Sequence, residues 1–217
     1  MRWFVGEFGA ASLNRAVVLP TEGYFQGTFG GTEQDVRALL DRVCAYLGVS
    51  PERVELEFFT DGHEQLRQSS SLFAEGRYQG VAGHYRREHG QTIVSINGSQ
   101  VGNLPGLIAT IAHELCHERL IGEHRVSGDE LDHEPLTDLL TVYLGMGIFT
   151  ANSALTVVQN SSGWRTERLG YLDPRLFGYG LAYYAWLRGE TKPPWAKHLS
   201  TNPRAYLKQG LRFKNRQ

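Results

Sequence analysis

The sequence predicts an α+β fold, and two observations carry that prediction. Short segments that alternate between apolar and polar residues come early in the chain, whereas amphipathic segments at helical spacing dominate after residue 100. Strands followed by helices, without regular alternation of the two, are typical of the α+β class. With 217 residues, 41% of them apolar and 21% charged, the chain suits one globular domain. We therefore expect a small mixed or antiparallel sheet over a helix, followed by a helical C-terminal part.

Three parts are expected within this single domain, which covers residues 1–217. Residues 1–100 supply strands and one helix, residues 101–150 supply helices with candidate metal ligands, and residues 151–217 form a helical, aromatic and basic tail. The first thirty residues are rich in glycine and aromatic residues, and they predict short strands and turns.

The first predicted helix begins at Thr32, where Thr-Glu-Gln-Asp resembles a capping box with Asp35 at its fourth position. Apolar residues follow at helical spacing until Gly48, which ends the helix. The alternating segment Val54–Phe59 predicts a strand, and the polar segment 61–76 predicts a short helix or a loop.

A hairpin and four helices complete the prediction. Residues 81–85 and Gln91–Asn97 are strand-like and are joined by a polar turn. The helices are expected to begin at four prolines or capping residues: near Pro105, Asp132, Asp173 (with Gly189 behind it) and Asn202.

Composition restricts the class of protein. A formal net charge of −1 gives no global argument for binding nucleic acid or membranes, although residues 165–217 are basic. No segment approaches 18 uninterrupted apolar residues, so we expect no membrane span, and the N-terminal segment does not resemble a secretory signal. Only Cys44 and Cys116 are present, which favours a reducing compartment over a disulfide framework. We expect a cytoplasmic protein.

The most informative segment is His113-Glu114-Leu115-Cys116-His117, inside a predicted amphipathic helix. Residues four apart lie one above the other on a helix, so both imidazoles can bind one ion. Glu114 lies at the rim of that face, where its carboxylate can contact a water molecule next to the ion. This HExxH pattern supplies two ligands and a general base from one helical turn, and zinc is the expected ion.

A catalytic zinc site usually has three protein ligands, and the sequence offers several candidates for the third. Glu134 begins the next predicted helix and is preferred. His124 competes if the first helix continues past Gly122, and His133 can reach only if its loop turns inward. Asp138, one turn after Glu134, can accept the free ring N–H of a ligating histidine.

HELCH on a helix, a strand before it and Glu134-xxx-Asp138 after it resemble the gluzincin branch of the zincin metallopeptidases, over about residues 81–149. The resemblance implies a zincin-like fold, Glu134 as the third zinc ligand and Asp138 as a hydrogen-bond partner of a ligand. It also implies that a peptide substrate lies antiparallel to an edge strand, expected at Gln91–Asn97. The gap between His117 and Glu134 is slightly shorter than is common in that branch, and the metzincin spacing is absent.

These features predict a zinc-dependent metallopeptidase that acts on a peptide or protein, with Glu114 as the catalytic base. The alternatives are a non-catalytic zinc-binding sensor or interaction module with the same centre, and a metal hydrolase that acts on another amide or on proteins at nucleic acid. A residue that stabilises the oxyanion is also needed, and its chemistry, but not its spacing, fits four candidates: Tyr143, Tyr171, Tyr179 and His198.

The C-terminal tail is rich in aromatic residues, which have two interpretations. They can form a substrate wall or a base-stacking platform next to arginines, or they can be the core of a helical layer. Spacing such as that of Leu176, Tyr183, Tyr184 and Leu187 favours the core, so nucleic acid is not an expected partner.

Overall fold

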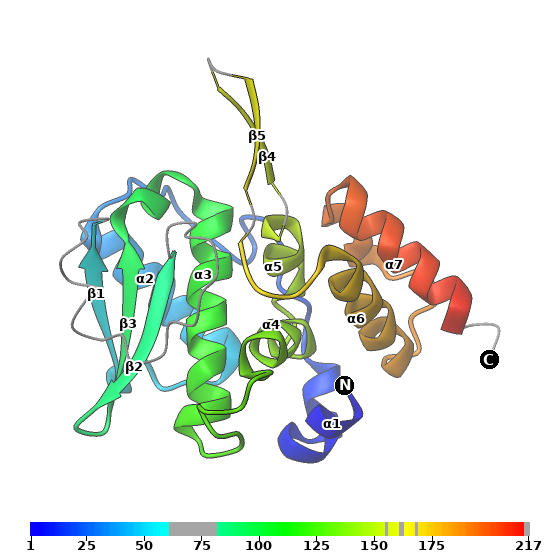
Figure 1. The fold of residues 1–217 in the computed structure, drawn as a ribbon, viewed down its shortest axis with the longest axis horizontal. Helices are drawn as coiled ribbons and strands as arrows, with labels where there is room; N and C mark the ends of the chain where they lie inside the picture. The colour runs from blue at the N-terminus through cyan, green and yellow to red at the C-terminus, as the bar shows by residue number, and fades with distance from the viewer. Residues whose placement is uncertain (61–81, 155, 161–162, 168, 215–217) are drawn as a thin grey trace.

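A three-stranded sheet with helices packed against it forms the N-terminal half of the protein, in a computed structural model that describes residues 1–60, 82–154, 156–160, 163–167 and 169–214 (Figure 1). Its order is β1 (Val54–Phe59), β3 (Gln91–Asn97), β2 (Gly83–Glu88). β1 runs parallel to β3, and β2 runs antiparallel to it. The sheet is therefore mixed, and the predicted α+β class is confirmed.

The helix predicted from Thr32 is confirmed as α2 (Glu33–Leu47). The Thr32 side chain accepts the backbone N–H of Asp35, and the Asp35 carboxylate accepts the N–H of Thr32, so two free helix-end donors are satisfied. Gly48 ends the helix in the left-handed conformation. The apolar face of α2 packs on α3 (Leu104–His117), and the strands contribute Val54, Val94 and Ile96 to the same core.

The hairpin between β2 and β3 is confirmed, but its turn is tighter than expected. β2 extends to Glu88, so only His89 and Gly90 lie between the strands. Both residues have positive φ, of 49° and 84°, as a two-residue turn matched to the strand twist requires. The polar segment 61–76 lies outside the described residues.

One strand prediction was wrong. Gln91–Asn97 was expected to be an edge strand, but β3 pairs with β1 on one side and with β2 on the other. All its residues after Gln91 are buried, as befits a central strand. Among the described strands, β2 is the edge next to α3, and β1 is the opposite edge.

The N-terminal prediction was also wrong. The first thirty residues contain no strand; instead they form α1 (Arg2–Phe8) and a 3-10 helix (Ala10–Asn14). α1 is held by the ring of Phe4, which is fully buried and lies 5.4 Å from the ring of Tyr143. Packing of a few aromatic side chains therefore stabilises α1, a helix that the composition of this segment did not predict.

The C-terminal half is largely helical, as expected, and consists of α4 (His133–Tyr143), α5 (Gly147–Ser153), α6 (Pro174–Leu187) and α7 (Thr201–Lys214). A hairpin of β4 (Thr156–Asn160) and β5 (Gly163–Glu167) was not expected. It projects from the top of the molecule in Figure 1. Among the described residues, no helix has the length and apolar character needed to cross a membrane.

Candidate metal centre

The candidate site lies where the end of α3 meets the start of α4. Asn103 caps the N-terminus of α3, because its side chain accepts the N–H of Gly106. The last twelve residues of α3 are all buried. After His117 the chain continues through one wider π-helical turn, Glu118–Gly122. A loop then leads to α4, whose first turn carries Glu134. The two helices thus bring His113, His117 and Glu134 together from segments 17 or more residues apart.

Three potential ligand atoms form a small triangle. His113 Nε2 lies 3.1 Å from His117 Nε2 and 3.0 Å from Glu134 Oε2, and His117 Nε2 lies 3.3 Å from the same oxygen. A tetrahedral ion with bonds of about 2.0–2.1 Å holds its ligand atoms about 3.3–3.4 Å apart. The three atoms are therefore close to the spacing that such an ion imposes, and the group can hold a metal ion.

Hydrogen bonds at the far side of each ring fix the ring tautomers. His113 Nδ1 donates to Asp138 Oδ1 at 2.8 Å. The Thr137 hydroxyl donates to the backbone oxygen of His133 at 2.7 Å, so it accepts from His117 Nδ1 at 3.2 Å. When both rings are neutral, as binding a metal ion requires, these bonds place the proton on Nδ1, and the lone pair of each Nε2 points toward the triangle. Two lone pairs and a carboxylate oxygen converge there, which is an arrangement that calls for a cation.

Asp138 anchors this arrangement. Its side chain is 1% exposed, and Oδ2 accepts the backbone N–H groups of Tyr171 and Leu172, both at 2.7 Å. The predicted contact between Asp138 and a candidate ligand is therefore present. Thr137 was not predicted, because a threonine on a helix carries no distinctive spacing.

Charge at the site follows from burial and hydrogen bonding. Burial opposes ionisation of Glu134, but its hydrogen bonds with His113 and His117 outweigh burial and lower its pKa. Burial also opposes protonation of His113, yet its bonds to Asp138 and Glu134 raise its pKa. Burial lowers the pKa of His117. An anionic Glu134 beside neutral His117 is the state suited to binding a cation.

Glu114 lies in the same buried region without belonging to the triangle. Its side chain is 6% exposed, and burial raises its pKa to about 7. Gly83 of β2 packs against it: a Cβ atom there would lie 2.6 Å from Thr110 Cγ2 and 3.0 Å from Glu114 Oε1. Only glycine allows the edge strand to approach the carboxylate so closely.

Two tyrosines contact the histidines. The ring of Tyr85, in β2, stacks on His117 with 5.7 Å between centroids, and its hydroxyl donates to the buried Glu118. The ring of Tyr171 stacks on His113 with 5.6 Å between centroids and is 56% exposed. Burial, followed by the charges of Glu134 and Glu114, raises the pKa of Tyr171. Its ring is therefore close to the carboxylates of the site.

The remaining candidates fall in different places. His124 follows the π-helical turn with a φ of 59° and is exposed, so it lies outside the group that can hold an ion. His133 turns inward, and its ring lies 5.6 Å from that of His117, but it is not part of the triangle.

Of the four candidates for the oxyanion, only Tyr171 contacts a member of the triangle. Tyr143 is buried and its hydroxyl donates to the backbone oxygen of Gly9. The ring of Tyr179 packs beside Tyr183 on α6, and the backbone oxygen of His198 accepts a bond from Asn152.

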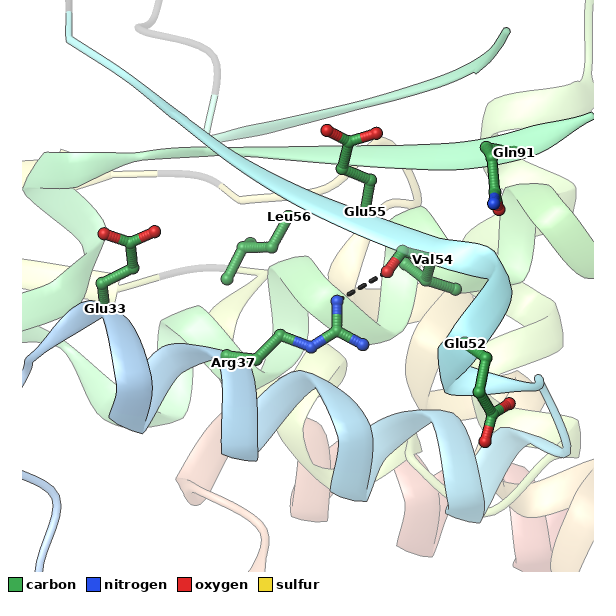
Figure 2. A pocket seen from close by; sticks show the side chains of 7 residues that line it. All are labelled: Glu33, Arg37, Glu52, Val54, Glu55, Leu56 and Gln91. Atoms are coloured by element: carbon green, nitrogen blue, oxygen red, sulfur yellow. Dashed lines mark hydrogen bonds between the residues drawn. The ribbon is translucent and has the colours of Figure 1, made fainter. Parts of the chain in front are cut away.

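A shallow pocket on the opposite edge of the sheet is separate from this centre (Figure 2). It lies between α2 and β1, and its one cation, Arg37, donates to the backbone oxygens of Val54 and Pro51 and pairs with Asp41. Because the guanidinium already has these partners, the pocket offers no unpaired cation, and its other charged lining residues are carboxylates.

Comparison of the chain with protein-family models, with curated proteins and with solved structures finds no match. The likeness to gluzincins therefore rests on the HELCH residues, Glu134 and Asp138.

Proposed function

We propose that the protein is a zinc-dependent peptidase whose general base is Glu114. The observation that carries this proposal is the triangle of His113, His117 and Glu134 with a separate buried carboxylate beside it. A purely structural or sensory metal site needs no such carboxylate, so Glu114 favours catalysis over the non-catalytic alternative. Two imidazoles and one carboxylate, with a fourth position left over, are the donor set typical of catalytic zinc.

In the proposed reaction each residue of the site has a separate role. When bound, zinc supplies Lewis-acid chemistry, because it polarises a carbonyl group and favours ionisation of water. Glu114 accepts the proton of the attacking water on its carboxylate and returns it to the leaving nitrogen. Burial raises the pKa of Glu114 in the metal-free protein, so its carboxylate is a stronger base than an exposed one. Asp138 and Thr137 hold the two imidazoles in the tautomer that presents Nε2.

β2 takes the substrate-binding role expected for Gln91–Asn97. Asn97 N–H donates to the backbone oxygen of Ala82. In an antiparallel pair every second residue bonds to the neighbouring strand, so His84, Arg86 and Glu88 of β2 bond to β3 in turn. The backbone groups of Gly83, Tyr85 and Arg87 therefore point away from β3, toward the free edge. A peptide strand paired with these groups would pass beside Glu114 and His117, which lie next to Gly83 and Tyr85.

The first test is the metal content of purified protein, measured by mass spectrometry on wild type and variants. We expect about one zinc ion per chain in wild type. His117→Ala and Glu134→Ala should lose it, whereas His124→Ala should keep it. Folded wild type that carries no metal and takes up none would contradict the proposal. Retention by Glu134→Ala together with loss in His124→Ala would leave a zinc site but refute this ligand set.

A second prediction concerns Tyr171. We expect Tyr171→Phe to lower kcat for a peptide substrate about 100-fold, because removal of one oxyanion donor costs about that much. Zinc content should not change, since the phenyl ring still stacks on His113 and the backbone N–H still binds Asp138. Tyr179→Phe, on α6, is the matched control and should keep full activity. Equal kcat values for wild type and Tyr171→Phe would exclude the hydroxyl from the reaction.

A further inference from the structure

The outer face of the last two helices is an aromatic surface. α6 and α7 lie side by side at the edge of the molecule, with α7 outermost (Figure 1). They run parallel, because Gly178 packs against Tyr206 and, one turn later, Ala182 packs against Gly210. A Cβ at Gly210 would lie 2.5 Å from Ala182 Cβ, so small residues bring the helices together. Larger side chains consequently point outward beside this seam.

The aromatic residues of the tail divide into two groups. Phe177, Tyr184 and Trp195 are buried in the second core cluster, as the core interpretation predicts. Those on α6 and α7 outside this cluster, together with one leucine, are exposed or half-buried, and we call them the aromatic face: Leu176, Tyr179, Tyr183 and Trp186 on α6, and Tyr206 and Phe213 on α7. The expectation that the tail aromatics are core is thus wrong for this second group.

The rings on α6 form a continuous row. Tyr179, Tyr183 and Trp186 follow one another at helical spacing, with centroid distances of 6.2 and 5.4 Å. Lys214 of α7 places its Nζ atom 4.5 Å from the centroid of Tyr183 and 4.6 Å from that of Trp186. The row therefore carries a cation on the rings themselves.

The same segment has a large excess of positive charge. Residues 174–214 contain eight Lys or Arg and one carboxylate, Glu190, a formal charge of +7 (8 − 1). Arg188 pairs with Glu190. Within the part of the chain that the structure describes, none of the other seven has an ion-pair partner: Arg175, Lys192, Lys197, Arg204, Lys208, Arg212 and Lys214. Lys214 lies on the exposed rings, and the other six cations belong to the same two helices or to the segment that joins them. A partner with negative charge therefore fits this segment.

We propose that the aromatic face, together with the cations of residues 174–214, binds single-stranded nucleic acid without strong sequence preference. Every base has a flat face that stacks on a tyrosine or tryptophan ring, and phosphates pair with the free cations. A second copy of the chain is a poor occupant, because a symmetric contact would bring together two segments that each carry a formal charge of +7. The proposal does not depend on the metal centre, which lies on α3 and α4.

The test is fluorescence anisotropy with a labelled dT20 oligonucleotide, titrated with the full chain at several salt concentrations. Each neutralised phosphate of a single strand contributes about −0.7 to the slope of log K against log salt. If four to seven of the free cations engage, we expect a slope of about −3 to −5. Lys208→Gln and Arg212→Gln should each make the slope shallower by about 0.7.

The aromatic contribution is tested separately at fixed salt. Trp186→Ala and Tyr179→Ala should each weaken binding about fivefold to hundredfold and leave the salt slope unchanged, because stacking involves no counterions. Trp3→Ala is the matched control: Trp3 is also 41% exposed but lies on α1. It should not affect binding.

Four outcomes would overturn the proposal. No binding of dT20 at low salt excludes the surface as a nucleic-acid site. Equal binding of polyglutamate, with Trp186→Ala without effect on dT20, would reduce the interaction to charge alone. Light scattering that shows a wild-type dimer and a monomeric Trp186→Ala would assign the face to self-association. Tight binding to anionic phosphatidylserine vesicles, with dT20 not bound, would assign it to a lipid surface.

Discussion

Glu114→Gln is expected to lower kcat for a peptide substrate by about 10²- to 10⁴-fold, the contribution of a positioned general base. The amide has the shape of the carboxylate, so the packing against Gly83 persists. Since Glu114 is not part of the triangle, the variant should still bind one zinc ion. The measurement is steady-state cleavage of a peptide library, with zinc content determined on the same samples.

The same substitution should change how stability depends on pH in the zinc-free protein. Burial raises the pKa of Glu114 from 4.5 to about 7, so the folded state binds more protons than the unfolded state between these values. This carboxyl group therefore costs stability as pH rises from 4.5 to 7, by up to about 3 kcal/mol. Glu114→Gln lacks this cost, so it should be the more stable protein above pH 7, with the gain disappearing below pH 4.5.

Either result can fail in an informative way. Unchanged kcat in a zinc-loaded Glu114→Gln would remove Glu114 from the reaction and return the centre to a structural or sensory role. Loss of zinc in the variant would instead make Glu114 a ligand. A stability gain that does not vary with pH would mean that the pKa of Glu114 is the same in the folded and the unfolded protein.

The sequence was sufficient for those parts of the site that local geometry determines. His113 and His117 are one helical turn apart, so any helix through this segment places both rings on one face. Glu134 and Asp138 obey the same rule on the next helix. The π-helical turn and the loop after His117 bring these two pairs together. The sequence gives the length of this connection but does not predict its conformation. In the structure Glu134 lies beside the two histidines and His124 is exposed, a difference that the sequence did not indicate.

Features that depend on packing between distant segments were missed. Gly83 faces Glu114 because β2 packs against α3, and the position of a strand in a sheet cannot be derived from alternation within that strand. Tyr171 reaches His113 because its backbone N–H is bound by Asp138, 33 residues earlier. The aromatic face was mistaken for core because spacing on a helix indicates which residues share a face, not whether a partner covers it.

Asp138→Ala is expected to have the second largest effect, because one buried carboxylate serves three donors. His113 Nδ1 loses its acceptor, so the ring is free to rotate or change tautomer, and zinc affinity should fall about 10- to 100-fold. The N–H groups of Tyr171 and Leu172 are also left without their acceptor, which should lower the free energy of unfolding by about 2–4 kcal/mol even without zinc.

Two measurements separate these effects of Asp138→Ala: competition with a chelating dye for zinc affinity, and urea unfolding of the zinc-free protein for stability. Asp132→Asn, an exposed carboxylate just before α4, is the matched control and should change neither quantity. Thr137→Val removes the acceptor of His117 alone, so it should weaken zinc binding less than Asp138→Ala does. Wild-type zinc affinity in a folded Asp138→Ala would mean that packing against Tyr171, rather than the carboxylate, orients His113.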